Sequence, residues 1–159
     1  MFSQPQEEHK ILDQLVGEWV MEQECKMGPD QPPMKSESTI STRSLGGLWI
    51  VSEMVGPGPD GTEHRSIMSV GYDPKLGKYP GTFIASMMSH MWVYSGTLSA
   101  DKKRLVLAAT GPKWDGEGNA EYEDIIEFVD KDNWNFLSQI KGDDGKWTQF
   151  MTSKVRRKK

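Results

Sequence analysis

The chain contains very little cysteine, since Cys25 is the only one among its 159 residues. A single thiol excludes a disulfide within the chain and any zinc site built from several cysteines. The sequence also lacks an uninterrupted apolar run as long as a membrane-spanning helix needs. Residues 1–8 lack the basic and apolar regions of a secretory signal. Together these absences predict a soluble, cytoplasmic protein.

An excess of positive charge is absent as well. The formal net charge is −4 at pH 7 and the sequence pI is about 5.4. Nucleic acids and anionic membranes attract proteins mainly through basic surfaces. The only basic run, residues 154–159, is typical of a solubilising tail. We therefore expect neither nucleic acid nor a membrane among the partners.

Recognisable catalytic motifs are missing too. Residues 56–61 have the spacing of a dinucleotide-binding loop, but Pro57 and Pro59 occupy its spacer positions and no helix is expected after it. Residues 115–126 begin like a calcium-binding loop, but Ala120 replaces the turn glycine and Ile126 replaces the final glutamate. We interpret both as loops between strands. The sequence thus assigns no catalytic residue and no metal site.

A short helix is predicted near the start of the chain, over about residues 4–16. Ser3 and Gln6 have the spacing of a capping box. Leu12, Leu15 and Val16, with Glu8 or His9 a turn earlier, form a narrow apolar stripe, and a glycine follows directly. The helix is therefore expected to pack one face against the rest of a single domain that spans residues 1–159.

The remaining chain, about residues 18–156, reads as ten short strands separated by turn residues. The clearest turn lies between Tyr72 and Tyr79, where Asp73, Pro74 and Gly77 suit a tight reversal. Short connections favour pairing between sequential strands, and closure removes the two exposed edges of such a meander. We predict an all-β fold, an antiparallel up-and-down barrel, with a two-sheet sandwich as the alternative. The expected strands cover residues 18–26, 35–45, 49–55, 63–72, 79–87, 92–99, 104–110, 120–129, 133–141 and 146–155.

Two sets of motifs carry a family resemblance. The segment Leu15-Val16-Gly17-Glu18-Trp19 resembles the Gly-x-Trp start of calycins, the superfamily that includes lipocalins. With residues 45–49 and 71–79 added, the order resembles a bacterial family catalogued as domain of unknown function 1579. The resemblance implies a lipocalin-like barrel whose Trp19 ring is covered by Arg156 or Arg157, and it brings no established ligand or reaction. The chain departs from the expected family pattern at Ala85, where an acidic residue is anticipated.

A barrel of ten strands is expected to leave a cavity, because eight strands already give an interior that side chains only just fill. The first hypothesis is therefore noncatalytic binding of a small apolar or amphipathic ligand. Asp124 is the expected polar anchor, with Arg43 or Arg65 as conjectured partners. Alternation along the strands gives the expected lining: Trp19, Met21, Met54, Met68, Phe83, Met87, Trp92, Tyr94, Tyr122, Asp124 and Phe136.

Three alternatives remain open at this point. The first is an enzyme that uses the cavity for isomerisation or hydrolysis, with Asp124 or His90 as acid or base. The second is haem or copper binding through His90 or His64, because imidazole and thioether groups cluster around residues 85–92. The third concerns assembly, since Trp49 or Trp147 could belong to a homodimer face.

Overall fold

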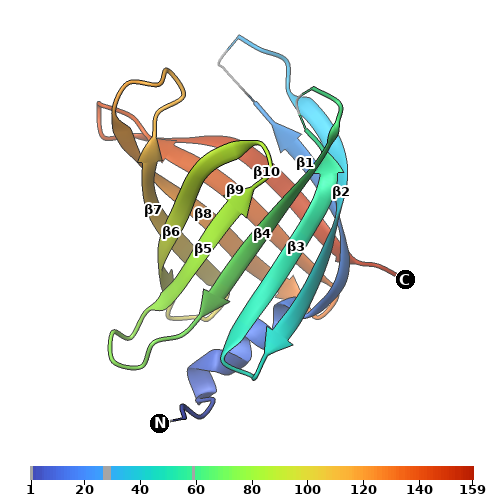
Figure 1. Ribbon diagram of the computed structural model, residues 1–159, viewed down its shortest axis with the longest axis vertical. Helices are drawn as coiled ribbons and strands as arrows, with labels where there is room; N and C mark the ends of the chain where they lie inside the picture. Colours follow the sequence, from blue (N-terminus) through green and yellow to red (C-terminus); the bar gives the residue numbers. More distant parts are fainter. Residues whose placement is uncertain (1, 27–29, 59) are drawn as a thin grey trace.

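The structure is a computed structural model that describes residues 2–26, 30–58 and 60–159. These residues form a short helix followed by ten strands (Figure 1). No helix in this part of the chain has the length and hydrophobicity needed to cross a membrane. The elements are η1 (Glu7–Leu15), β1 (Gly17–Cys25), β2 (Met34–Leu45), β3 (Trp49–Pro57), β4 (Glu63–Gly71), β5 (Tyr79–Ala85), β6 (Met88–Leu98), β7 (Arg104–Pro112), β8 (Asn119–Asp130), β9 (Asn133–Lys141) and β10 (Trp147–Arg157).

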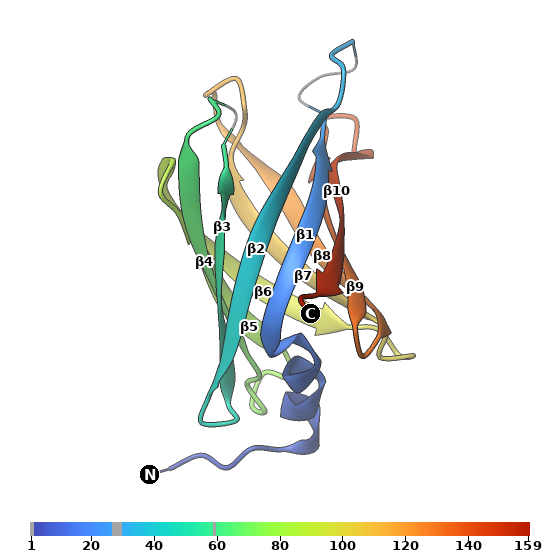
Figure 2. The same cartoon turned by 90° about the vertical axis from the view of Figure 1, so that its right-hand side faces the viewer.

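The ten strands form a closed antiparallel barrel in which sequential strands pair with each other. β1 closes the ring by pairing with β10, which places Trp19 opposite Arg157 and Met21 opposite Val155. Figures 1 and 2 show the strands tilted around one continuous wall. The predicted up-and-down barrel is therefore confirmed, and the sandwich alternative is wrong.

The turn between β4 and β5 has the predicted chemistry. The backbone N–H of Asp73 donates to the carbonyl of Lys78 at 2.8 Å, and the Asp73 carboxylate accepts from the N–H of Lys75 at 2.9 Å. Gly77 has φ of 63°, a left-handed conformation that glycine adopts without strain. This local chemistry fixes the β4–β5 register.

η1 covers one end of the barrel, which we call the closed end (Figure 2). It is a 3-10 helix whose buried residues are His9, Leu12 and Leu15. A 3-10 helix has three residues per turn, so these residues lie on one face and point into the barrel end. His9, Leu12 and Leu15 of the predicted stripe are therefore buried, whereas Val16 follows the helix and is half-buried.

The start of η1 also differs from the expectation. The backbone N–H of Gln6 donates to Nδ1 of His9 at 2.8 Å, so the capping interaction involves Gln6 and His9 instead of Ser3 and Gln6. The Tyr79 hydroxyl donates to the carbonyl of Glu8 at 2.8 Å. This bond ties the helix to β5.

The opposite end, which we call the open end, carries the β1–β2, β3–β4, β5–β6, β7–β8 and β9–β10 turns (Figure 1). One prediction fails there. β5 ends at Ala85 and β6 already begins at Met88, so the expected strand over residues 79–87 is shorter. Met87 lies in the turn and is 49% exposed, so it does not line the interior. Alternation does not extend into a turn, which is why counting along the strand misplaced this side chain.

Candidate functional site

The barrel interior changes from the closed end to the open end. Near η1 the inward-facing side chains are fully buried, as shown by Trp19, Ile50 and Leu105. Toward the open end inward positions such as Met68 and Trp92 are only half-buried. Water therefore reaches the open half of the lumen and is excluded from the closed half.

A small cavity of about 40 Å³ lies between these two halves. It includes five of the predicted lining residues: Met21, Met54, Met68, Phe83 and Phe136. The other side chains around it are Leu15, Ile40, Ile50, Ser52, Ser66, Ile126 and Trp134. The volume suffices for ordered water but is well below the roughly 300–1,000 Å³ of typical ligand pockets.

Three methionines give this cavity an adaptable wall. Met21 is fully buried, whereas Met54 and Met68 are half-buried and lie on the neighbouring strands β3 and β4. Met54 is paired with Ser66 and Met68 with Ser52, so each methionine faces a small side chain across the sheet. Unbranched thioether side chains repack at low cost. The cavity can therefore grow on the open side without a change in the strands.

Asp124 faces the lumen from β8 and is held by two hydroxyl groups. Tyr94 on β6 donates to its Oδ2, and Ser138 on β9 donates to its Oδ1 at 2.5 Å. The conjectured arginine partners are wrong, because Arg43 is exposed and Arg65 binds Glu53. The reason is geometric, since both arginines occupy outward positions of their strands.

Burial controls the ionisation of this cluster. Desolvation raises the pKa of Asp124, although the hydrogen bonds from Ser138 and Tyr94 act in the opposite direction. Desolvation also raises the pKa of Tyr94 well above its ordinary value, and the neighbouring Asp124 adds to this. Tyr94 thus remains a hydrogen-bond donor at neutral pH, while Asp124 is a buried carboxyl group without a cationic partner among the described residues.

An aromatic cluster lines the open end above Asp124. The ring of Trp92 packs edge-on against Tyr122 at 4.8 Å and against His90 at 4.7 Å. Phe150 joins the cluster beside Tyr122, and Trp114 packs on Phe150. Trp92 and Tyr122, both expected in the lining, thus contact each other. Phe150 and Trp114 were missed because Phe150 lies at a β-bulge and Trp114 lies in the β7–β8 turn.

The two histidines proposed as metal or haem ligands have different surroundings. Nε2 of His64 lies 3.0 Å from Oδ1 of Asp60, and its Nδ1 lies 3.4 Å from the Ser86 hydroxyl. Both ring nitrogens of His64 are therefore already engaged at the rim. Nε2 of His90 is buried without a hydrogen-bond partner. Within residues 2–26, 30–58 and 60–159, no three His, Cys, Asp or Glu side chains gather as a metal site would require.

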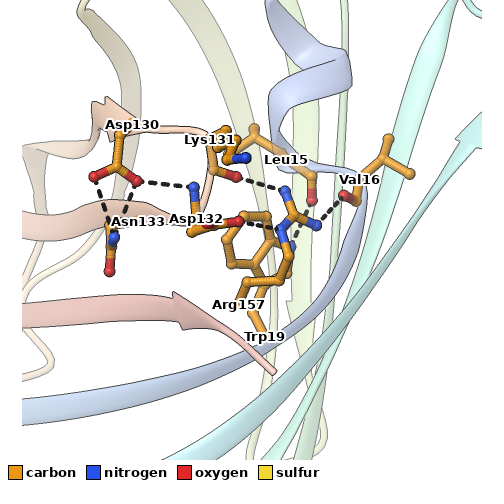
Figure 3. Close-up of polar contacts among 8 residues, drawn as sticks. All are labelled: Leu15, Val16, Trp19, Asp130, Lys131, Asp132, Asn133 and Arg157. Carbon is orange, nitrogen blue, oxygen red and sulfur yellow. Dashed lines mark hydrogen bonds and ion pairs between the residues drawn. The ribbon is translucent and has the colours of Figure 1, made fainter. Parts of the chain in front are cut away.

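Trp19 lies at the closed end and outside the cavity lining. It is 1% exposed, and its indole N–H donates to the carbonyl of Leu15 at 2.8 Å. The Arg157 guanidinium covers the ring at 4.2 Å from the centroid, as the resemblance implies (Figure 3). The same guanidinium binds the Asp132 carboxylate at 3.1 Å and the Lys131 carbonyl at 2.6 Å. Trp19 is therefore a structural residue, and its assignment to the cavity lining is corrected.

The outer surface offers two further observations. A groove of about 600 Å³ crosses β9, β10, β1 and β2 and is lined mainly by polar and charged side chains such as Glu22, Lys35 and Lys154. Trp49 and Trp147 are each 39% exposed, but Trp49 begins β3 at the closed end whereas Trp147 begins β10 at the open end. The two tryptophans therefore lie at opposite ends of the barrel, and a homodimer face that includes either of them stays a prediction.

The barrel resembles several solved structures at low sequence identity. Rv2717c from M. tuberculosis superposes with a TM-score of 0.68 and 13% identity, over 98% of this chain and 99% of that chain. The S-type phycobiliprotein lyase CPES from Guillardia theta gives 0.62 and 14%, over 94% and 92%. The protein EF1p2_mFAP2b, solved bound to DFHBI, gives 0.51 and 12%, over 94% and 98%. These likenesses establish the fold.

Sequence comparison establishes the family. A search of curated protein sequences found no significant match. A family model described as "Protein of unknown function (DUF1579)" matches residues 4–157, which is almost the whole chain. The chain therefore belongs to the DUF1579 family.

Proposed function

We propose that this protein binds a small, mainly apolar molecule inside the barrel and admits it through the open end. The observation that carries the proposal is the apolar cavity in the middle of the barrel. The inward side chains on its closed side are buried, whereas those on its open side are half-buried. A lumen with apolar walls and a few convergent polar groups is the usual form of a small-molecule site. Among the residues that the structure describes, the closed barrel leaves no free strand edge for another strand, and the net charge of −4 disfavours a nucleic acid.

The size of the cavity sets a condition on the ligand. About 40 Å³ is too little for a drug-sized molecule, so binding requires that Met54 and Met68 turn toward the open end. Both side chains are half-buried and have room to do so. Two of the structural neighbours support ligand binding by such a barrel, since one was solved with DFHBI and another is a phycobiliprotein lyase.

The test uses the neutral fluorescent probe N-phenyl-1-naphthylamine and three proteins. The wild type is compared with Met68→Ala, which enlarges the lumen, and with Ile67→Ala, which removes a neighbouring side chain that is 40% exposed on the outer face. We expect the probe to bind the wild type, to bind Met68→Ala several-fold more tightly, and to bind Ile67→Ala like the wild type. Failure of all three to bind, or equal binding to all three, would overturn the proposal.

Catalysis is a second candidate function, and the buried Asp124 is the observation that favours it. A carboxyl group whose pKa is raised by burial is typical of general acids and bases in enzyme sites. The two candidate functions differ in whether the protein converts the molecule that it binds. Native mass spectrometry of freshly purified protein, beside a denaturing extract of the same sample, identifies any retained molecule. Incubation of that molecule with fresh protein should leave it unchanged for a binding protein and convert it for an enzyme.

Haem is an alternative ligand that the same purification can detect. Among the described residues, Nε2 of His90 is a buried ring nitrogen without a hydrogen-bond partner. If a Soret band forms when haem is added to the wild type and does not form with His90→Ala, the ligand is haem and His90 binds it.

A further inference from the structure

We propose that the ligand of the barrel carries a protonated amine, which binds the carboxylate of Asp124 while the apolar body of the ligand fills the cavity. This inference rests on the proposed function, because it names the class of molecule that the same lumen would select. Nothing in the family description or in the structural neighbours assigns a role to Asp124.

The position of Asp124 suits a ligand whose polar head points toward the open end. On β8, Asp124 lies two residues from Ile126, and on β9 its partner Ser138 lies two residues from Phe136. Ile126 and Phe136 both line the cavity. β8 runs away from the open end and β9 runs toward it, so Asp124 and Ser138 lie just above the cavity on the route to solvent.

The carboxylate is oriented but lacks a charged partner. Tyr94 and Ser138 each donate one hydrogen bond to it, which leaves acceptor capacity on both oxygens. No ion pair within the described part of the chain includes Asp124. The nearest charged side chains of its own strand, Glu123 and Glu127, face outward and bind Gln139 and Arg104. A buried carboxylate without a cation is costly, so a protonated amine gains more from this site than a neutral group of the same shape.

The side chains above Asp124 favour the same charge. Trp92 precedes Tyr94 by two residues on β6, and Tyr122 precedes Asp124 by two residues on β8, so both rings face the lumen closer to the open end. Aromatic faces attract cations and offer no compensation to an anion. An anionic ligand would also be repelled by Asp124 itself. The site therefore discriminates by charge as well as by hydrophobicity.

The experiment compares three probes with one ring system: 1-naphthylmethylamine, 1-naphthylmethanol and 1-naphthoate. Their affinities are measured at pH 7 by displacement of N-phenyl-1-naphthylamine from the wild type, Asp124→Asn and Glu123→Gln. Glu123→Gln is the matched control, because it removes the adjacent carboxyl group on the outer face of the same strand. We expect the amine to bind the wild type about tenfold more tightly than the alcohol, with the weakest binding for the carboxylate.

In Asp124→Asn we expect the amine to lose this tenfold advantage while the alcohol binds within about twofold of the wild type. Glu123→Gln should behave like the wild type. Equal affinity of the amine and the alcohol for the wild type would overturn the charge selectivity and leave the proposed function intact. Failure of all three probes to bind would overturn the proposed function itself.

A measurement on the wild type alone keeps the inference testable if Asp124→Asn fails to fold. Between pH 3 and pH 7 the naphthylmethylamine remains protonated, so its affinity should rise as Asp124 ionises, whereas the alcohol should change little. The titratable groups that face this part of the lumen are Tyr94, Tyr122 and His90; the tyrosines remain neutral over this range because burial raises the pKa of each. His90 lies in the same part of the lumen, so His90→Ala is included as a control, and the rise must persist in it. An amine affinity that does not change with pH in the wild type, or whose rise is lost in His90→Ala, would overturn the inference.

Discussion

The two ends of the barrel interior are built from different kinds of side chain. At the closed end, Trp19, the inner face of η1 and the aliphatic residues around them are almost fully buried. At the open end the inward positions hold serines, methionines, aromatic rings and one carboxyl group, and many of them keep contact with water. Tight packing contributes stability, whereas incomplete packing leaves free energy available for a ligand. The closed end therefore stabilises the fold, and the open end is free to bind.

Truncation of one tryptophan at each end tests whether the two ends contribute differently to stability. Trp19→Ala removes a fully buried ring, its hydrogen bond to Leu15 and its contact with Arg157. We expect a loss of about 3–5 kcal/mol in the free energy of unfolding, measured by urea denaturation. Trp114→Ala, at a ring that is 53% exposed near the open end, should cost less than about 1 kcal/mol. Similar losses in the two variants would show that the ends do not differ in this way.

A second prediction concerns the arginine that covers Trp19. Arg157→Lys keeps the positive charge but loses the planar group that contacts the ring, the Asp132 carboxylate and the Lys131 carbonyl (Figure 3). We expect a loss of about 1–2 kcal/mol in unfolding free energy. The adjacent Arg156→Lys is the control, because Arg156 faces outward and lies 3.7 Å from Glu22 in an exposed pair. Equal effects at both positions would mean that only charge matters at the closed end.

A third prediction tests the open half through pH. Because burial raises the pKa of Asp124 above its unfolded value, the folded state holds this proton more tightly than the unfolded chain. Its contribution to stability is present below about pH 4 and is lost as the pH rises through the folded pKa, by about 1.4 kcal/mol per unit of difference. Denaturation of the wild type and Asp124→Asn at several pH values should show the wild type losing stability relative to the variant as pH rises. A constant difference, or one of opposite sign, contradicts the prediction.

The smallest effect is expected at the rim of the open end. His64 links Asp60 and Ser86, and thereby joins the β3–β4 loop to the β5–β6 turn. His64→Ala should speed amide hydrogen exchange at Thr62 and Ser86 while the melting temperature stays within about 2 °C of the wild type. The amide of Leu105, at a fully buried residue, is the internal reference. Unchanged exchange at the rim would mean that the imidazole does not hold these loops together.

Turn chemistry explains why the fold could be predicted from the sequence. Asp73, Gly77 and similar residues mark where each strand ends, and sequential pairing then leaves few topologies. The Trp19–Arg157 contact followed from the family resemblance. The predicted helix was placed correctly, and the structure adds that it is a 3-10 helix with His9, Leu12 and Leu15 on its buried face.

The candidate site was predicted only where strands are regular. Met54, Met68 and Phe83 lie within strands, so alternation placed them correctly in the lumen. Ser138 was missed because regular counting back from the Asp130–Asn133 pair places Gln139 opposite Asp124. The irregularity between Phe128 and Asp130 shifts the register by one residue and puts Ser138 there. The cavity volume could not be predicted, because it depends on how side chains from many strands fill one shared space.

The pairing of β1 with β10 has a consequence for how the chain folds. The Arg157 guanidinium donates to the Val16 carbonyl, and these residues are 141 positions apart in the sequence. β1, which follows Val16, and β10, which ends at Arg157, pair with each other and close the barrel at what we call the seam. Long-range contacts of this kind raise the entropic cost of reaching the native topology, and folding of such all-β proteins usually takes milliseconds to seconds. Until β10 pairs with β1 and β9, each of these two strands has one edge without a hydrogen-bonded neighbour. The seam is therefore the step at which a folding chain is most exposed to pairing with another molecule.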